Sequence, residues 1–552
     1  MEIRYTDRLY HYYETTLVLT DVRLAYVFCI RQQGTTYYFC EDGVVLQYDF
    51  AEGFYNFFQM PYINRNDVLP TVKWMKSAVF YQIFVDRFFC GNTKKDRSYI
   101  NMEWGALPTP KSFAGGDLCG IIEKLDYLKE LGITAIYLTP IFRSISNHKY
   151  DTMDYMQIDP QFGTKEEFGE LVRMAHAHGI RIVLDAVFNH CSMQMQQFCD
   201  VMEKGVESLY YDWFLIDGAY PVPSRANYEC FAECTYMPKL DTANPEVQEY
   251  LIGIACYWIR EYGIDGWRLD VVDELPDEFV RRLRRRMRQI DPQSLLLGEV
   301  WEDASNKIAY GVRRRYFTDR ELDSVMNYPW QKEILRFVRG DADGADLGER
   351  IMTLAENYPP EVLSCVMNHL GTHDTPRILT VLGEPFCGTK DERAHRRMTP
   401  VQRKTALMRL RMAVFLQFPL PGMPCIYYGD EAGMEGFEDP FCRTCYPWGR
   451  EDEELQAYYR MMTALRGSSE ALRRGGLRVL AAGNGRIAFT RAFGDERLVV
   501  CVNHSIGEWV LPAGRVRFAE SAAPSPTGEV VLMRGGFCLL EPSDPEAHIS
   551  IE

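Results

Sequence analysis

The sequence predicts an α/β protein built on a parallel (β/α)8 TIM barrel, with an insertion after the third strand, a short N-terminal β module and a C-terminal β-sandwich. Apolar, strand-like runs alternate with helix-like stretches between residues 77 and 465, and polar residues follow many of the runs. The residues before and after this stretch show only strand-like patterns. The alternative, a doubly wound open sheet, would gather functional residues at one switch point rather than at many strand ends.

The N-terminal module is predicted to span residues 1–70. Short runs rich in Val, Tyr and Phe are separated there by turn-forming residues such as Gly34 and Gly43. We predict strands at 16–19, 25–31, 36–39 and 44–48, and a linker at 61–70.

The barrel is predicted to span residues 71–465. Its expected strands are 78–85, 135–138, 180–187, 266–271, 295–300, 324–326, 362–367 and 424–428. Its clearest helices are 120–131, 165–178, 245–262, 276–290 and 403–418, where apolar residues recur with a period near 3.6.

An irregular insert at residues 191–240, rich in aromatic side chains, follows the third predicted strand as a separate domain B. An excursion of this length at a strand end is more often functional than accidental. Residues 466–552 are predicted to form the C-terminal β-sandwich, with strands at 477–481, 486–490, 498–502 and 530–533.

Composition excludes several classes of partner. The 552-residue chain carries a net charge of −16, which argues against nucleic-acid and anionic-membrane partners. It has no run of about 18 apolar residues, so no membrane span is predicted. The N-terminus shows no apolar signal core, so we expect a cytoplasmic protein with free thiols at its sixteen cysteines.

Two close cysteine pairs, Cys230 with Cys234 and Cys442 with Cys445, raise the alternative of a zinc or redox site. Each pair lacks the spaced second pair that identifies a zinc site, so structural thiols are the favoured interpretation. A barrel enzyme that uses a phosphate or nicotinamide is also disfavoured, because no Gly-rich phosphate loop follows any predicted strand.

Four polar segments at predicted strand ends carry the chemistry: 185–190, 266–270, 298–301 and 372–375. Arg268 lies two residues before Asp270 on one strand, so both side chains point the same way and the guanidinium can keep the carboxylate ionised. Asp270, Glu299 and Asp374 should converge on the C-terminal face of the barrel. Three carboxylates with an arginine and two histidines fit cleavage of a glycosidic bond, in which like-charge crowding raises the pKa of the acid.

The order of these motifs, D-x-x-x-N-H, G-x-R-x-D, G-E-x-W and H-D, resembles glycoside hydrolase family 13, the α-amylase family, over about residues 20–550. The resemblance implies that Asp270 is the nucleophile, Glu299 the acid/base and Asp374 the transition-state stabiliser. It also implies a retaining, double-displacement mechanism through a covalent glycosyl-enzyme.

The resemblance further implies a set of substrate-binding residues. Arg268 would orient the nucleophile, His190 and His373 would bind sugar hydroxyls, and Tyr150 would form an aromatic platform. Trp301 would stack a sugar on the leaving-group side. The complete implied set is His148, Tyr150, His190, Arg268, Glu274, Trp301, His373 and Arg377.

The segment M-P-K-L-D at residues 237–241 resembles the M-P-K-L-N signature of the neopullulanase, cyclomaltodextrinase and maltogenic amylase group. Members that cut α-1,6 bonds usually carry Q-P-D-L-N instead. The resemblance therefore implies cleavage of α-1,4-glucosidic bonds in cyclomaltodextrins and maltooligosaccharides, with pullulan and starch as further candidates.

Two alternatives remain open within this resemblance. The enzyme could mainly transfer glycosyl groups or act as an α-glucosidase, since loops decide whether water or a sugar accepts the glycosyl group. A non-catalytic carbohydrate-binding relative belongs to another class, but such relatives typically lose one of the three carboxylates, and all three are present here.

The sequence departs from the group in three places. The N-terminal module resembles a shortened starch-binding-like module, so both a monomer and a homodimer are open. Asp273 stands where the group often has Asn, which would alter acceptor preference.

The third departure is in loop 90–96. Relatives carry Asn and Asp calcium ligands in this loop, whereas Cys90 and Lys95 are poor ligands for a hard cation. The chemistry needs no cofactor; a structural calcium would rely on Asn92, Asp96 and Asp117, unless the Lys95 ammonium replaces it.

Overall fold

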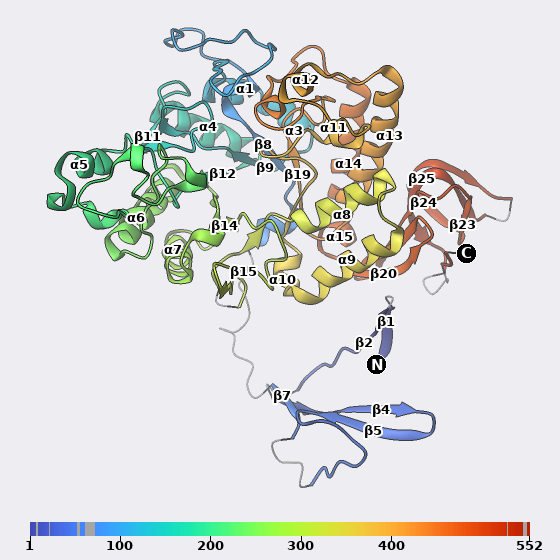
Figure 1. Ribbon diagram of the computed structural model, residues 1–552. Helices are drawn as coiled ribbons and strands as arrows, with labels where there is room; N and C mark the ends of the chain where they lie inside the picture. The colour runs from blue at the N-terminus through green and yellow to red at the C-terminus, as the bar shows by residue number, and fades with distance from the viewer. Residues whose placement is uncertain are drawn as a thin grey trace. The chain divides into compact units, whose positions relative to one another are not determined.

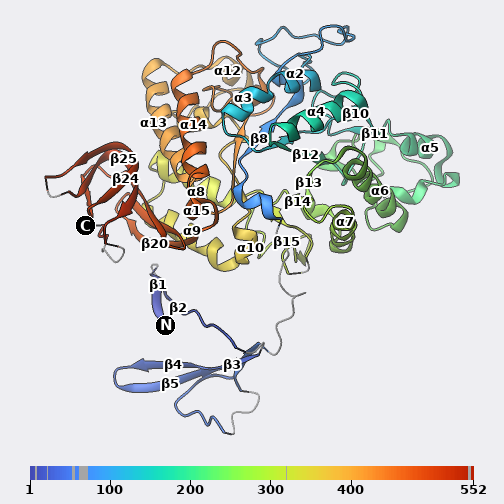
Figure 2. The same cartoon turned by 180° about the vertical axis from the view of Figure 1, so that it is seen from behind.

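The computed structural model describes residues 1–6, 9–20, 23–51, 56–60, 72–318, 320–526, 528–544 and 549–551. The chain divides into two compact units, Met1–Thr71 and Val72–Glu552. The second unit is seen from two opposite sides in Figures 1 and 2, with the barrel at its centre and a β domain at one edge.

The first unit consists of short antiparallel strands in its described part. Gln33 and Gly34 both have positive φ, 49° and 81°, and form the two-residue turn of a β-hairpin. The predicted β module is thus confirmed, although the predicted strand at 16–19 is irregular and the predicted linker at 61–70 lies outside the described residues. The strands are β1 (Glu2–Thr6), β2 (His11–Glu14), β3 (Leu24–Tyr26), β4 (Phe28–Gln32), β5 (Thr35–Cys40), β6 (Gly43–Val45) and β7 (Phe58–Met60).

Eight parallel strands form the barrel, which confirms the predicted fold class over an open sheet. Each barrel strand except the sixth pairs with the next barrel strand along the chain, and the last pairs with the first. The remaining seam is bridged once, between Met326 and Met367. The strands are β8 (Phe80–Ile83), β9 (Ala135–Leu138), β12 (Arg181–Ala186), β13 (Gly266–Leu269), β14 (Leu295–Gly298), β17 (Ser324–Val325), β18 (Met367–His369) and β19 (Met423–Tyr427).

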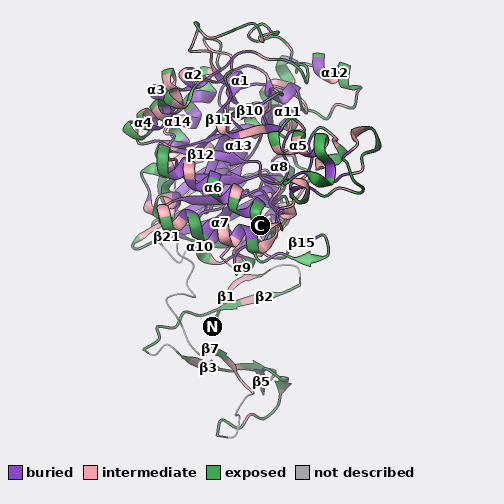
Figure 3. Ribbon diagram, turned by 90° about the vertical axis from the view of Figure 1, so that its left-hand side faces the viewer, coloured by how far each residue is buried: buried purple, intermediate pink, exposed green. Residues whose placement is uncertain are grey.

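The barrel interior is filled by apolar side chains from these strands, and Figure 3 shows the buried residues gathered at the centre with exposed ones on the outer helices. The longer helices are α4 (Lys165–Ala177), α6 (Pro245–Tyr262), α7 (Asp277–Ile290), α8 (Tyr328–Arg339), α9 (Gly344–Asn357), α13 (Pro400–Gln417) and α14 (Glu453–Gly467). The shorter ones are α1 (Val85–Phe88), α2 (Leu118–Glu123), α3 (Leu125–Glu130), α5 (Gln196–Lys204), α10 (Pro360–Leu363), α11 (Ile378–Leu382), α12 (Lys390–His395) and α15 (Glu470–Arg474). No helix among the described residues has both the length and the apolar character needed to cross a bilayer.

Helix α6 illustrates why some boundaries could be predicted to the residue. The Asn244 side chain accepts a hydrogen bond from the backbone N–H of Glu246, Pro245 occupies the first turn, and Gly263 ends the helix with a φ of 68°. The predicted helix 120–131 is instead divided into α2 and α3 at Lys124, which lacks helical ψ.

The insert after β12 contains α5 and short 3₁₀ turns, and it returns to the barrel through an isolated bridge between His190 and Lys239. A second bridge, between Phe214 and Leu240, lies within the insert. A hairpin of β10 (Phe142–Ser144) and β11 (Thr152–Ile158) follows β9. A smaller hairpin, β15 (Ile308–Ala309) with β16 (Val312–Arg313), follows β14. These three excursions all leave from the C-terminal ends of barrel strands.

The C-terminal domain is a six-stranded antiparallel sheet in which the long β25 pairs with β22, β23 and β24. It lies beside α9 and α13 in Figure 1, and the Arg411 side chain of α13 pairs with Glu520 of β24. Its strands are β20 (Gly476–Gly483), β21 (Arg486–Phe493), β22 (Glu496–Asn503), β23 (Trp509–Leu511), β24 (Gly514–Pro524) and β25 (Val530–Pro542).

Candidate active site

A cavity of about 410 Å³ opens at the C-terminal end of the barrel and brings the three predicted catalytic carboxylates together. Asp270 follows β13, Glu299 follows β14, and Asp374 lies in the loop after β18. The lining residues are His148, Tyr150, Phe231, Tyr236, Met237, Asp270, Val271, Asp273, Glu299, Trp301, Asp374, Asp439 and Arg443.

One guanidinium, that of Arg268, organises three carboxylates. Its Nη1 donates hydrogen bonds to Asp270 Oδ1 at 2.8 Å and to Asp185 Oδ1 at 2.9 Å. Its Nη2 forms an ion pair with Glu299 Oε2 at 2.9 Å. Arg268 is fully buried on β13, so these contacts fix Asp270 and Glu299 on either side of one rigid, planar group.

The backbone between the two carboxylates is strained. Val271, directly after Asp270, has φ 45° and ψ 49°, a left-handed conformation that β-branched residues rarely adopt. In this conformation the Val271 N–H donates to Glu299 Oε2 at 3.0 Å. Strain of this kind, where it occurs at a cavity, is typical of functional sites, and here it supplies a donor to Glu299.

Trp301 holds the other oxygen of Glu299. Its indole Nε1 donates to Glu299 Oε1 at 3.1 Å, and its ring stacks on Tyr328 with centroids 4.1 Å apart and an interplanar angle of 13°. Tyr328 is fully buried, whereas Trp301 is 37% exposed. One face of the indole is therefore covered by Tyr328, and the ring lines the cavity beside Glu299.

Asp374 is held by two groups. Its Oδ1 accepts a hydrogen bond from Arg443 Nη2 and its Oδ2 lies close to His373 Nε2, both at 3.1 Å. Arg443 also donates from Nε to the His373 carbonyl at 2.8 Å and pairs with Asp439 at 3.2 Å. Sequence analysis missed both Arg443 and Asp439, because the only signal in that segment was the pair of cysteines around Arg443.

Tyr150 occupies the position of the predicted platform. Its ring stacks on His373 with an interplanar angle of 2°, and its hydroxyl donates to Asp185 Oδ2 at 2.9 Å. Tyr137, from β9, donates to the same Asp185 oxygen at 2.5 Å. Asp185 therefore supports both Arg268 and Tyr150 from below the cavity.

The predicted histidines lie at or next to the cavity. His148 lines it and stacks on Tyr150, and the fully buried His190 stacks on Phe231 with centroids 4.4 Å apart. Burial lowers the pKa of each to about 4, and burial lowers the pKa of His373 well below its usual value. All three imidazoles are therefore neutral near pH 7, a form in which one ring nitrogen donates and the other accepts a hydrogen bond.

Five of the predicted substrate-binding residues are not among those that line the cavity: His190, Arg268, Glu274, His373 and Arg377. Two of these, Arg377 and Glu274, make structural contacts between loops. Arg377 is fully buried, where its Nη1 donates to Asp430 and its guanidinium lies over the ring of Tyr427. These contacts tie the loop after β18 to the loop after β19, so the structure gives Arg377 a supporting position instead. Glu274 accepts from Asn189 at 2.7 Å and pairs with Lys239 at 2.9 Å, and thereby joins the insert to the loop after β13.

Burial raises the pKa values of the two carboxyl groups that Arg268 Nη1 contacts, Asp185 and Asp270. Burial raises the pKa of Asp270 well above its usual value, and the negative charges of Glu299 and Asp185 add to this, while Arg268 opposes it. The sequence led us to expect that Arg268 would dominate and keep Asp270 ionised; the contact exists, but burial outweighs it. One guanidinium thus serves three carboxylates at this end of the barrel.

The loop that contains the calcium candidates Asn92 and Asp96 holds an ammonium group, the alternative that the sequence also offered. Lys95 Nζ donates to the carbonyls of Gly115 and Gln161, both at 2.8 Å, and pairs with Asp117 Oδ2 at 2.9 Å. Asp117 also accepts hydrogen bonds from three backbone N–H groups. Asp96 accepts one from the backbone N–H of Ser98. The Lys95 ammonium thus lies against the carboxylate and the carbonyls that could otherwise ligate a hard cation.

We therefore expect stability to be independent of calcium. EDTA should leave the Tm unchanged, because the Lys95 ammonium supplies the positive charge. Lys95→Met should lower the free energy of unfolding by about 3 kcal/mol, since it leaves the buried Asp117 carboxylate without its counter-ion. The exposed neighbour provides a matched control, Lys94→Met, which should change little. A Tm that falls in EDTA and recovers with calcium would contradict this interpretation.

Buried neutral histidines should also make stability depend on pH. Burial lowers the pKa of His369 to about 3 and that of His190 to about 4, below the value of about 6.5 that applies in the unfolded chain. The unfolded state then binds more protons, so stability falls as the pH drops from 6.5 toward 4, by about 1.4 kcal/mol per pH unit for each histidine. Urea unfolding across this range should show a shallower slope for His369→Gln, whereas the exposed control His395→Gln should not alter it.

Comparisons with known proteins agree with this geometry. Residues 82–475 match the α-amylase catalytic domain, and residues 1–64 match the N-terminal ig-like domain of α-amylases. A cyclomaltodextrinase of Geobacillus thermopakistaniensis is 40% identical over 508 residues, 91% of this chain and 81% of the relative. Neopullulanase 2 of Thermoactinomyces vulgaris is 40% identical over 510 residues, 90% of this chain and 81% of that protein.

A solved cyclomaltodextrinase structure superimposes with a TM-score of 0.84 at 35% sequence identity, and the match covers 98% of this chain and 90% of the other. The fold, the order of the motifs and the sequence matches agree with one another. The chain therefore belongs to the α-amylase family, glycoside hydrolase family 13, as its four motifs predicted.

Proposed function

We propose that this α-glucan hydrolase is a retaining enzyme that cleaves α-1,4-glucosidic bonds of cyclomaltodextrins and maltooligosaccharides. Asp270 is the nucleophile, Glu299 the acid/base and Asp374 the stabiliser of the transition state. The observation that carries the proposal is the shared guanidinium of Arg268, which pairs with Asp270 through one nitrogen and with Glu299 through the other.

The first displacement forms the glycosyl-enzyme. A carboxylate oxygen of Asp270 bonds to the anomeric carbon while the bond from that carbon to the glycosidic oxygen breaks, and Glu299 gives its proton to the leaving oxygen. The positive charge that develops on the sugar ring is stabilised by nearby carboxylates in a buried site.

The second displacement returns the enzyme to its starting state. Glu299, now ionised, removes a proton from water as the water oxygen bonds to the anomeric carbon, and the ester bond to Asp270 breaks. Arg268 stabilises the released carboxylate. Asp374, oriented by Arg443 and His373, accepts hydrogen bonds from sugar hydroxyls in both steps, and Tyr150 supports the ring through its aromatic face.

The cavity and the relatives support the proposed substrate class. A cavity of about 410 Å³ with aromatic walls fits a short, curved glucan better than a bulk polymer. Two of the similar proteins above are named cyclomaltodextrinase and neopullulanase. We also propose a cytoplasmic location, because all sixteen cysteines are free and a 36% identical relative is named intracellular maltogenic amylase.

Initial rates on β-cyclodextrin, soluble starch and pullulan at equal mass test the proposed substrates. We expect the highest rate on β-cyclodextrin, with maltose and glucose as products, and no rate with Asp270→Asn as the blank. A clear preference for starch would contradict the narrow-site interpretation. Products longer than the substrate would instead indicate that a sugar, and not water, accepts the glycosyl group.

A further inference from the structure

A second cavity, of about 700 Å³, lies outside the active site. It opens between the loop that follows β8, residues 89–114, and the segment around Trp448 after β19. No residue that lines it also lines the catalytic cavity. One loop segment nevertheless reaches both cavities. Asp439 and Arg443 line the active site, and Trp448, a few residues later in the same segment, lines the second cavity.

The walls of this second cavity are aromatic and rigid. The indole Nε1 of Trp448 donates to the Phe88 carbonyl at 2.6 Å, and that of Trp104 donates to the Tyr446 carbonyl at 3.0 Å. The Lys124 ammonium lies over Phe89 and Trp448, 4.1 and 4.2 Å from the ring centroids. Lys124 and Tyr446 already cover part of the Trp448 ring. Since both indole N–H groups are bonded, the parts of these rings that line the cavity offer a ligand apolar surface.

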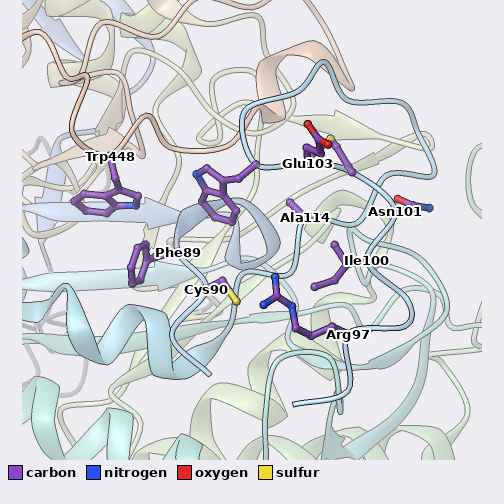
Figure 4. A pocket seen from close by; sticks show the side chains of 10 residues that line it. Phe89, Cys90, Arg97, Ile100, Asn101, Glu103, Ala114 and Trp448 are labelled. Carbon is purple, nitrogen blue, oxygen red and sulfur yellow. The ribbon is translucent and has the colours of Figure 1, made fainter. Parts of the chain in front are cut away.

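Two charged side chains on the rim have unused hydrogen-bonding capacity. Arg97 and Glu103 line the cavity, and neither side chain has a hydrogen-bond or ion-pair partner within the described ranges. Figure 4 shows the Arg97 guanidinium directed inward, from the side opposite Trp448 and Phe89. Asn101, by contrast, is fully engaged with Lys111 and Phe113 and fixes the loop.

This combination selects a neutral ligand with apolar faces and hydroxyl edges. A phosphate would be repelled by Glu103 and a cation by Arg97, so a strongly charged ligand is disfavoured. A sugar ring presents C–H groups to an aromatic surface and hydroxyls that both donate and accept, which matches the indoles, the guanidinium and the carboxylate. The volume lies within the usual range for small-ligand sites, about 300–1,000 Å³.

We propose that this cavity is a second binding site for an α-glucan chain, separate from the catalytic cavity. Its ligand class rests on the proposed function. Because one loop segment lines both cavities, a long chain held here stays close to the active site, which raises its effective concentration there. A short oligosaccharide cannot occupy both sites at once, so the second site does not raise its rate of cleavage.

Calorimetry on Asp270→Asn, which binds without turnover, tests the site directly. We expect maltoheptaose to titrate two classes of site, one of which weakens at least about fivefold when Arg97→Ala or Trp104→Ala is added. Arg97 is exposed and unpartnered, so its removal cannot unfold the loop, and Trp104→Phe should restore part of the affinity. The matched control is Arg285→Ala, another exposed arginine, on α7. A single class of site, or a second class unchanged by Arg97→Ala, overturns the proposal.

Kinetics on the catalytically intact enzyme separate this proposal from the proposed function. Arg97→Ala should lower kcat/KM for soluble starch about fivefold and leave that for maltotriose within about twofold. Equal losses on both substrates, or no loss on starch, contradict the second site. If the wild-type enzyme cleaves neither substrate, the proposed function fails, while two classes of maltoheptaose site on Asp270→Asn would still establish the cavity as a glucan site.

Discussion

Asp270→Asn is expected to lower turnover of β-cyclodextrin at least about a thousandfold, because an amide cannot form the glycosyl ester. The same change should leave the Tm unchanged or raise it. Burial raises the pKa of Asp270, so its ionised form destabilises the folded protein at neutral pH, and Asn removes that charge while it keeps the shape. Initial rates and thermal unfolding at pH 7 measure the two effects together.

The control for this variant is Asp495→Asn, which removes an exposed carboxylate from the turn between β21 and β22 and should affect neither quantity. If Asp270→Asn turned over at the wild-type rate, Asp270 would not be the nucleophile. If Asp270→Asn lost both activity and folding, its loss of activity would not be informative. Glu299→Gln and Asp374→Asn would then have to fold and show the same loss of turnover; folded variants that keep the wild-type rate would contradict the assignment.

Arg268→Met is expected to destabilise the protein by about 3 to 5 kcal/mol and to abolish activity. It leaves Asp185, Asp270 and Glu299 buried around the space of a single missing cation. Arg268→Lys should recover part of the stability, because the charge returns, but little activity, because an ammonium cannot hold two carboxylates in the fixed geometry of a guanidinium. Urea unfolding and initial rates on β-cyclodextrin are the measurements.

A second substitution separates the effect of the unbalanced charge from the effect of losing the alignment of Asp270. Asp185→Asn added to Arg268→Met should restore stability without activity, since it removes one unbalanced carboxylate and leaves the nucleophile unaligned. Arg284→Met is the matched control, because Arg284 is also buried and pairs with Asp323 outside the cavity. It should lower stability and leave the rate of the folded protein intact. An Arg268→Met variant that is as stable and as active as the wild type would contradict the central place of this residue.

The barrel could be predicted because its signals are local. Asn244, Pro245 and Gly263 mark both ends of α6 in the sequence itself. The predicted strand at 362–367 was wrong except at its last residue, because α10 occupies Pro360–Leu363 and β18 begins only at Met367. An apolar run of six residues fits a buried strand and the inner face of a short helix equally well, and only tertiary packing decides between them.

In the candidate site, too, some residues could be predicted from the sequence and others could not. Asp270, Glu299 and Asp374 follow strand-like runs, so their convergence could be predicted from barrel geometry. Arg443 and Asp439 reach the cavity from a loop after β19, and Val271 takes a left-handed conformation that its residue type disfavours. Contacts between distant loops and local strain leave no pattern in the sequence, and for the same reason the buried position of Arg377 was not predicted.

The stereochemistry of the first product tests the central claim most directly. Proton NMR of the reaction with maltotriose, recorded before the released sugar mutarotates, reports the anomer that the enzyme forms. A double displacement through Asp270 inverts the anomeric carbon twice, so the account predicts the α-anomer. Initial release of the β-anomer would show a single displacement by water and would contradict the assignment of Asp270 as nucleophile.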